Sequence, residues 1–212
     1  MVNAMRDVII RQVDRKEKAI IKEIARIHVQ TFEGFFLTFM GKGFLKTMYQ
    51  TYCRHEGSNL LGAFDGNGQV VGFLAYSQNM SGLYKYMIKY KLVQFAWYSL
   101  GAFIRKPKVF IRLIRAFLKP SEAKREESYI ELSSIGIAPS AKSQGIGSKL
   151  IADLKEREKH SKSVYICLET DAENNEGANA FYVKNGFRLE RVYYTKENRK
   201  MNEYRYYLEQ AE

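Results

Sequence analysis

ELSSIGIAPSAKSQGIGSKLIADL, at residues 131–154, predicts a buried strand, a sharp turn and a glycine-containing loop that opens an amphipathic helix. A loop of this kind directs several backbone N–H groups to one point, at the positive end of the helix dipole. Such a point holds phosphate without much help from charged side chains. The stretch therefore predicts a site for a phosphate-bearing ligand.

The spacing of the loop narrows the choice of ligand. A nucleotide P-loop would end in Gly-Lys-Ser/Thr, a dinucleotide-binding fold would carry GxGxxG early in a βαβ unit, and neither string is present. The string KSQGIG, at residues 142–147, resembles motif A of the GNAT superfamily of N-acetyltransferases, with the pattern Gln/Arg-x-x-Gly-x-Gly/Ala. Gly145 and Gly147 match the two small positions. Lys142 replaces the usual Gln or Arg, which keeps a cation near the phosphates.

A second string supports the same resemblance. NEGANAFYVKNGF, at residues 175–187, is similar to the motif B pattern Asn-x-x-Ala-x-x-Phe-Tyr-x-x-x-Gly-Phe of that superfamily. The two motifs occur in the family's order, with a predicted strand, SVYICLET, between them. The chain thus resembles a bacterial GNAT N-acetyltransferase over residues 129–192.

The whole chain is expected to form one domain, residues 1–212. Its length suits a single substantial core, and 46% hydrophobic residues indicate a folded globular protein. The first residues lack the apolar run and small-residue cleavage site of a secretory signal, and both cysteines, Cys53 and Cys167, lie in apolar contexts typical of buried thiols. We therefore expect a cytoplasmic protein.

Apolar periodicity predicts the elements around the motifs. Residues 7–13 alternate like a strand, and residues 17–32 and 44–52 have helical spacing. The aromatic-rich stretch between these helices is broken by glycines and is expected to form a loop, and Asp65-Gly66-Asn67-Gly68 predicts a hairpin turn. Residues 173–184 are expected to be helical, and the C-terminal residues to form two strands. With the resemblance, this order predicts an α+β, GNAT-like fold. Its mixed, mostly antiparallel central sheet would have about seven strands flanked by helices, with a basic helical insertion between strands 3 and 4.

The insertion, at about residues 82–124, carries most of the net charge. Lysine and arginine exceed aspartate and glutamate by 34 − 23 = 11, and no acidic residue lies between Asp65 and Glu122. The cations in this interval are Lys85, Lys89, Lys91, Arg105, Lys106, Lys108, Arg112, Arg115 and Lys119. Lys108, Arg112, Arg115 and Lys119 would form one stripe along a helix.

Three interpretations of the insertion remain open. Its helices pack on the sheet or on a second subunit of a homodimer, with the cations in solvent. Alternatively, it forms a positive lid over an anionic acceptor. In the third interpretation it makes a peripheral membrane contact on anionic lipid, favoured by Trp97 and by tyrosines beside lysines. It does not cross a membrane, since its longest uncharged run is residues 92–104 and a span needs about 20 residues. No nucleic-acid reading module is recognisable.

The resemblance implies acetyl-CoA as the co-substrate and assigns its binding residues. The loop would hold the pyrophosphate, backbone groups of two strand residues would pair with the pantetheine arm, and Asn175 would contact that arm. The expected residues are Ile135, Ile137, Lys142, Ser143, Gln144, Gly145, Ile146, Gly147, Ser148, Asn175 and Tyr182. No metal is predicted, because the three histidines show no metal-ligand spacing.

Acetyl transfer to an amine requires a base for the amine and a donor for the departing thiolate. In the family, the Tyr of the Phe-Tyr pair lies close to the sulfur, so Tyr182 is the candidate donor. Glu169, at the end of the strand after motif A, is the first candidate base, and Glu131, at the start of the motif A strand, is the second. Each residue also has a structural alternative. Tyr182 would cap the helix against the sheet. Glu169 and Glu131 would form ion pairs at the edge of a strand.

The acceptor is less well defined by the sequence. Residues 28–49 are similar to the amino-terminal region of bacterial acetyltransferases of surface-polysaccharide biosynthesis, and the basic insertion could meet a diphosphate. These features favour a small-molecule amine, with a nucleotide-linked amino sugar as one coherent choice. The alternatives are a protein or peptide N-acetyltransferase and a non-catalytic CoA-binding or membrane-associated module.

Overall fold

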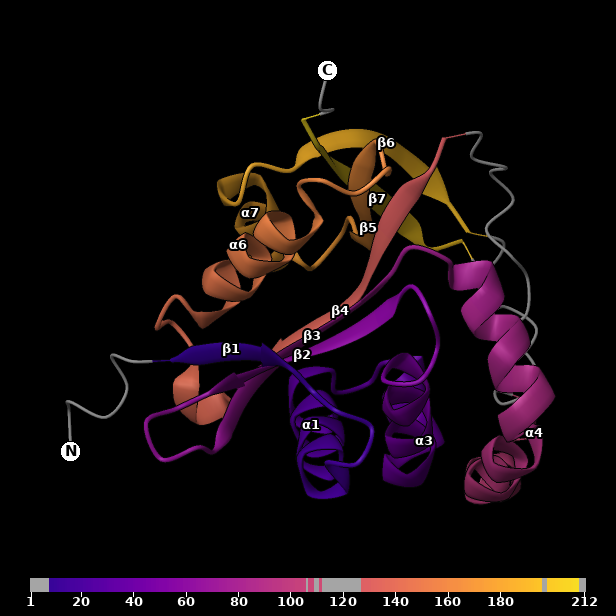
Figure 1. Cartoon of the computed structure of the whole chain (residues 1–212). Coiled ribbons are helices and arrows are strands. Elements are labelled where there is room, and N and C mark those ends of the chain that lie inside the picture. The colour runs from indigo at the N-terminus through magenta and orange to yellow at the C-terminus, as the bar shows by residue number, and fades with distance from the viewer. Residues whose placement is uncertain (1–7, 106, 109–110, 112–126, 196–197, 210–212) are drawn as a thin grey trace.

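The computed structural model describes residues 8–105, 107–108, 111, 127–195 and 198–209, which form one seven-stranded sheet with helices on its two faces (Figure 1). The sheet order is β1-β2-β3-β4-β5-β7-β6. The strands are β1 (Ile9–Gln12), β2 (Ser58–Phe64), β3 (Val70–Ser77), β4 (Tyr129–Ile137), β5 (Tyr165–Asp171), β6 (Arg188–Tyr194) and β7 (Lys200–Tyr207). The helices are α1 (Lys18–Thr31), α2 (Phe36–Met40), α3 (Lys42–Tyr52), α4 (Met80–Arg105), α6 (Ile146–Glu158) and α7 (Glu176–Lys184), with a 3₁₀ turn, η1, at Pro139–Ala141.

All neighbouring strands are antiparallel except β4 and β5, whose parallel pairing is short. It covers Tyr129 to Glu131 of β4 and Tyr165 to Cys167 of β5. Beyond these residues the two strands diverge, and the sheet opens into two halves (Figure 1). The expected α+β fold with a mixed, mostly antiparallel sheet is confirmed, and the opening between β4 and β5 is its main irregularity.

The core lies on both faces of the amino-terminal half of the sheet. Helices α1 and α3 lie on one face and α6 on the other, so β2 and β3 are covered on both sides (Figure 1). Every residue of β3 is buried, as a strand covered on both faces requires. Helix α1 buries Ile21, Ile24 and Ile27 along one stripe, which confirms the helical periodicity of this segment.

One expectation about the amino-terminal half is wrong. The aromatic-rich residues before α3 were expected to form a loop, but they contain the short helix α2, and α3 begins at Lys42 rather than at Phe44. Gly34 and Gly41 have φ angles of +79° and +94°, so the glycines bound α2 instead of interrupting it. Composition alone did not distinguish a glycine at a helix end from one inside a loop.

The insertion between β3 and β4 contains α4, a single helix of 26 residues, as expected of a helical insertion at this place. Of the expected cationic stripe, Arg112, Arg115 and Lys119 lie outside the described residues. Across the described ranges, no helix combines the length and the apolar character needed to cross a membrane.

Candidate functional site

The site begins where β4 leaves β5. Ala75 and Tyr76 of β3 pair with Ser134 and Leu132 of β4, so Ser133 is an extra residue of β4 that forms a β-bulge. Further along β4, Ile135 and Ile137 pair with β3 on one side, while β5 has already diverged on the other. The carbonyl of Ile137 accepts a hydrogen bond from the Thr31 hydroxyl, at 3.2 Å. Among the described strands, only β3 pairs with this part of β4, and the binding of an extended ligand along Ile135 and Ile137 stays a prediction.

The loop after β4 presents the N-terminus of α6 to solvent. Ser143 and Gly145 have φ angles of 62° and 75°, and Gly145 is the residue that precedes the first turn of α6. The first N–H groups of a helix have no intrahelical acceptor, and none of the described side chains caps this end. Four of the predicted phosphate-binding residues are exposed here: Lys142, Ser143, Gln144 and Gly145.

The following part of the loop enters the helix. Ile146 is buried in the core, while Gly147 and Ser148 are partly exposed in the first turn of α6. The Gln144 side chain lies over the loop, with Nε2 3.5 Å from the Ser140 carbonyl oxygen. The predicted residues thus form a left-handed turn followed by open helix N–H groups, which is the geometry that binds phosphate.

Helix α7 is held against the end of β5 by two asparagines. It begins at Glu176, three residues later than expected, because Asn175 lies outside the helical region, at φ −144°. The Asn175 side chain donates hydrogen bonds to Thr170 Oγ1 at 2.7 Å and to the Asp171 carbonyl at 3.4 Å. Asn179, which the sequence analysis did not single out, donates to the same carbonyl and accepts from Asn202 and Tyr204.

Tyr182 is buried between α7 and the carboxy-terminal half of the sheet. Its ring contacts those of Phe181, Phe187 and Tyr204. Burial raises the pKa of Tyr182 to about 12, so the hydroxyl keeps its proton at neutral pH. Among the residues that the structure describes, this hydroxyl has no hydrogen-bond partner. Tyr182 can therefore serve as a donor to a bound ligand.

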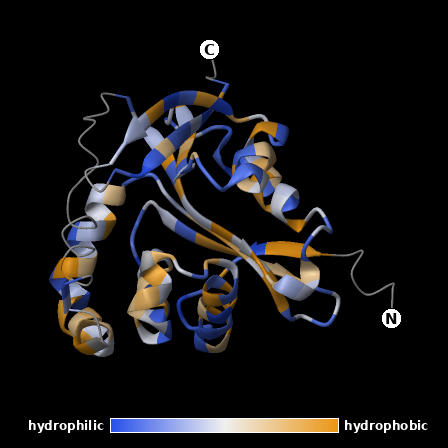
Figure 2. Cartoon of the chain, turned by 180° about the vertical axis from the view of Figure 1, so that it is seen from behind, coloured by the Kyte–Doolittle hydropathy of each residue, from blue (hydrophilic) through white to orange (hydrophobic). Residues whose placement is uncertain are grey.

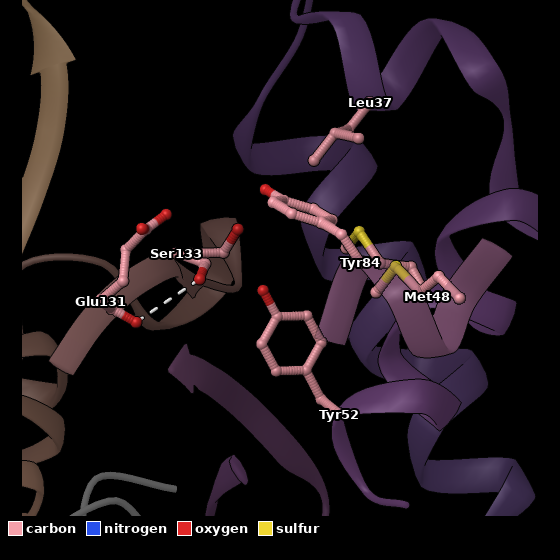
Figure 3. Close-up of a pocket in the computed structure, with 8 residues that line it drawn as sticks. Leu37, Met48, Tyr52, Tyr84, Glu131 and Ser133 are labelled. Carbon is pink, nitrogen blue, oxygen red and sulfur yellow. Dashed lines mark hydrogen bonds between the residues drawn. The ribbon is translucent and has the colours of Figure 1, made fainter. Parts of the chain in front are cut away.

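A cavity of about 100 Å³ lies between β4 and the helices α3 and α4. It is lined by Leu37, Met48, Tyr52, Tyr84, Met87, Glu131, Ser133 and Ser134. Figure 3 shows Tyr52 and Tyr84 directing their hydroxyl groups toward the bulge residue Ser133. The Ser133 hydroxyl lies 3.5 Å from the Glu131 carbonyl oxygen and 3.5 Å from Met80 Sδ. One acid, two phenols and two serines thus meet on an otherwise apolar wall.

The electrostatics of the cavity favour a cationic or neutral guest. Burial raises the pKa of Tyr52 and of Tyr84 above the usual range, and the charge of Glu131 acts in the same direction. Both tyrosines are therefore neutral hydrogen-bonding groups. Glu131 is the only acid among the described lining residues, and none of them is lysine or arginine.

The structure separates the two predicted bases. Glu131 and Glu169 face the same side of the sheet, since Glu131 pairs with Cys167 and Glu169 lies two residues further along β5. Glu131 lines the cavity, whereas Glu169 does not. The Glu169 carboxylate accepts a hydrogen bond from the Tyr193 hydroxyl at 2.6 Å and lies 4.0 Å from Arg191. Of the two acids, Glu131 is thus the one next to the cavity.

Sequence reasoning missed Tyr52 and Tyr84 as site residues. They come from α3 and α4, outside both motifs, and look like ordinary apolar-face tyrosines. Their only sequence signal was that a buried tyrosine hydroxyl usually has a polar partner. No group of three or more His, Cys, Asp or Glu side chains in the described part of the chain could hold a metal ion.

Comparisons with known proteins agree with this geometry. The model of the acetyltransferase (GNAT) family matches residues 22–187. No match was found among curated proteins. Solved structures with the same fold include the ribosomal-protein-S18-alanine N-acetyltransferase from Escherichia coli, with a TM-score of 0.57, 14% identity, and coverage of 97% of each chain.

Two further solved structures extend the comparison. Arabidopsis thaliana NAA60 in complex with acetyl-CoA has a TM-score of 0.57 at 14% identity, over 95% of this chain and 98% of that one. A spermidine N-acetyltransferase from Vibrio cholerae has a TM-score of 0.57 at 12% identity, over 94% and 93%. At these identities the likeness establishes a shared fold.

Proposed function

The chain belongs to the acetyltransferase (GNAT) family, and we propose that it transfers the acetyl group of acetyl-CoA to a primary amine of a small molecule. The observation that carries this proposal is the acidic cavity beside the opening between β4 and β5. The uncapped N-terminus of α6 at Gly145 supports acetyl-CoA as the co-substrate, because its free N–H groups suit a pyrophosphate.

In this proposal the co-substrate lies along the opening. The N–H groups of residues 145–148 bind the pyrophosphate, and Lys142 adds a positive charge. Backbone groups of Ile135 and Ile137 pair with the pantetheine arm as a further strand would. Asn175 reaches the arm from the start of α7. This path places the thioester near both Tyr182 and the cavity.

The proposed chemistry divides between the two sides of the thioester. Glu131 holds the acceptor as an ammonium ion and takes one proton from it, and the amine nitrogen then attacks the thioester carbonyl carbon. As the new C–N bond forms, the C–S bond breaks and the sulfur takes the electron pair, while the attacking nitrogen releases its second proton to water and becomes a neutral amide. Tyr182 donates a hydrogen bond to that sulfur, or gives it a proton that water then replaces. Glu169, held by Tyr193, stays outside the cavity lining and assists through its charge.

The size and lining of the cavity support a small amine. A volume of about 100 Å³ corresponds to roughly three water molecules, so it accepts the amine-bearing end of a ligand. The amide-rich backbone of a peptide would have few partners among Leu37, Met48 and Met87. For a nucleotide-linked amino sugar, the diphosphate would have to lie outside the cavity, since none of the lining residues is lysine or arginine.

The experiment that tests this proposal is an acetyl-transfer assay with three acceptor classes: small alkyl and aryl amines, nucleotide-linked amino sugars, and short peptides with free N-termini. We expect turnover with a small amine and a higher kcat/KM than for any peptide. A higher kcat/KM for peptides would assign the enzyme to protein acetylation. Absence of transfer to every class, with acetyl-CoA bound, would indicate the non-catalytic binding module.

A further inference from the structure

Helix α4 has one face packed on the protein. Met80, Leu83, Met87 and Ala102 are buried on this face, and Phe95 contacts Phe44 of α3 with ring centroids 4.6 Å apart. A second close contact places the Tyr98 ring against Gly43, where a Cβ would lie 2.3 Å from the ring. These contacts fix the helix along α3 and define which of its residues face outward.

The outward face of α4 is apolar. Val93 is 82% exposed, Trp97 73% and Ile104 70%, in a protein whose other apolar helical residues mostly face the core. We call this surface the α4 apolar face; its members are Ile88, Leu92, Val93, Trp97, Leu100 and Ile104. Ile88 and Leu92 are four residues apart, and Val93, Trp97, Leu100 and Ile104 follow one another at intervals of four, three and four residues, so together they form one continuous surface. Figure 2 shows hydrophobic residues along this helix, at the edge of the molecule.

The charge around this face has a single sign. Lys85 and Lys89 are exposed about two turns and one turn before Val93, on the same side of the helix. In the sequence, nine lysines and arginines and no acidic residue lie between Asp65 and Glu122. Within α4, lysine and arginine are the only charged side chains beside the exposed apolar stripe, and such a surface is complementary to one that is apolar inside and negative outside.

We propose that the α4 apolar face docks on an anionic lipid bilayer, with α4 lying in the plane of the headgroup region. The aliphatic side chains would enter the boundary of the acyl chains, Trp97 would sit at headgroup level, and Lys85 and Lys89 would meet anionic headgroups. Tyr84 and Met87 line the acceptor cavity from the inner side of the same helix. Docking would therefore hold the cavity close to the membrane surface.

A second copy of the chain fits this face less well. A two-fold interface would use the same surface on both subunits and would bring the lysines of each copy toward those of the other. The described face offers no acidic side chain to compensate them, and like charges at an interface oppose association. A spanning helix is a different structure, and α4 lacks the hydropathy for one.

The test uses the fact that Trp97 is the only tryptophan of the chain. Its emission therefore reports on this face alone. We expect a blue shift on addition of phosphatidylcholine vesicles that contain phosphatidylglycerol, with quenching by brominated acyl chains and co-sedimentation of the protein. Vesicles of phosphatidylcholine alone should bind much more weakly, because the cations contribute part of the affinity.

Matched variants distinguish vesicle binding by the α4 apolar face from nonspecific vesicle binding by other surfaces. Val93→Asp should reduce vesicle binding by roughly tenfold or more, since it places a carboxylate among apolar contacts and negative headgroups. Val183→Asp, the same change at a residue of α7 that is 58% exposed, should bind like the wild type. Replacing Lys85 and Lys89 together by Gln should cost roughly 30-fold. Circular dichroism checks that each variant is folded.

Two results would overturn the proposal. One is unchanged Trp97 emission of the folded wild type at saturating anionic vesicle concentration. The other is emission that is already blue-shifted without lipid, accompanied by a dimer mass that Val93→Asp reduces to that of a monomer. That second result would assign the α4 apolar face to an interface between copies of this chain.

Discussion

Gly147, in the first turn of α6, lies against the ring of Phe181 in α7: a Cβ at Gly147 would come within 3.0 Å of Phe181 Cζ. This separation is tighter than ordinary van der Waals contact. The glycine loop and the helix that carries Tyr182 are therefore in close contact, and a methyl group at Gly147 would require the Phe181 ring to move by a few tenths of an ångström. The second small residue of the glycine loop has a packing role in addition to leaving its N–H accessible.

Gly147→Ala should weaken acetyl-CoA binding and destabilise the fold by about 1 to 3 kcal/mol, because the added methyl group pushes α6 and α7 apart. Chemical unfolding and calorimetric titration measure the two effects. Gly101→Ala in α4 is the control, since nothing lies within 4 Å of the point that its Cβ would occupy, and alanine there should be neutral or stabilising. Equal behaviour of the two variants would refute the packing argument.

Glu131→Gln should reduce kcat by roughly 100-fold or more, because the amide cannot accept the proton of the acceptor. Glu169→Gln should have a smaller effect, since Glu169 is held by Tyr193 and does not line the cavity. Steady-state kinetics of both variants with the best amine give the comparison. If Glu169→Gln were the more damaging change, the base would be assigned to Glu169 instead.

Tyr182→Phe removes one hydroxyl from a buried ring and leaves the ring contacts with Phe187 and Tyr204 in place. We expect kcat to fall by roughly 100-fold with little change in the affinity for acetyl-CoA, because the hydroxyl acts on the leaving sulfur. The expected dependence on the leaving group is a second readout: a thioester with a less basic thiol should rescue the variant. A variant with wild-type kcat would restrict Tyr182 to packing.

His28 gives the stability a pH dependence. Burial lowers the pKa of His28 from 6.5 to about 4, and its Nδ1 lies 2.6 Å from the Tyr49 hydroxyl. Between these two values the unfolded chain binds a proton that the folded chain excludes, so the free energy of unfolding falls as the pH falls. The loss approaches roughly 3 kcal/mol near pH 4.

Urea unfolding of the wild type and of His28→Gln, at several pH values, checks this prediction. The variant is expected to lose less stability than the wild type between pH 6.5 and pH 4, whatever its absolute stability. Above pH 7 the two curves should run parallel. Identical slopes below pH 6.5 would show that other groups account for the acid sensitivity.

The sequence predicted those elements whose ends are marked by turn-forming or glycine residues close by in the chain. The hairpin between β2 and β3 turns at Asp65, whose carboxylate accepts hydrogen bonds from the N–H groups of Asn67 and Gln69. The order strand, glycine loop, helix around Gly145 is likewise confirmed. In both cases the decisive interactions lie within a few residues of one another, so spacing in the sequence reports them.

Contacts between elements that are far apart in the chain could not be predicted from the sequence. Tyr52 and Ser133 are 81 residues apart, and the bulge that directs Ser133 toward the tyrosine depends on the register of β3 with β4. The hydrogen bond from Tyr193 to Glu169 depends on how β7 pairs with β5 on one side and with β6 on the other. The sequence therefore indicated which carboxylates to consider, while only the fold separates the one in the cavity from the one beside it.

Titration of acetyl-CoA into three forms of the protein tests the central claim most directly: the wild type, Gly145→Asp and Gly145→Asn. Aspartate and asparagine have the same shape and both tolerate the left-handed conformation at this position, so they differ in charge alone. We predict micromolar binding by the wild type, retained binding by the asparagine variant, and loss by the aspartate variant through repulsion of the pyrophosphate. Absence of binding by the folded wild type, or equal affinity of the two variants, would contradict the account.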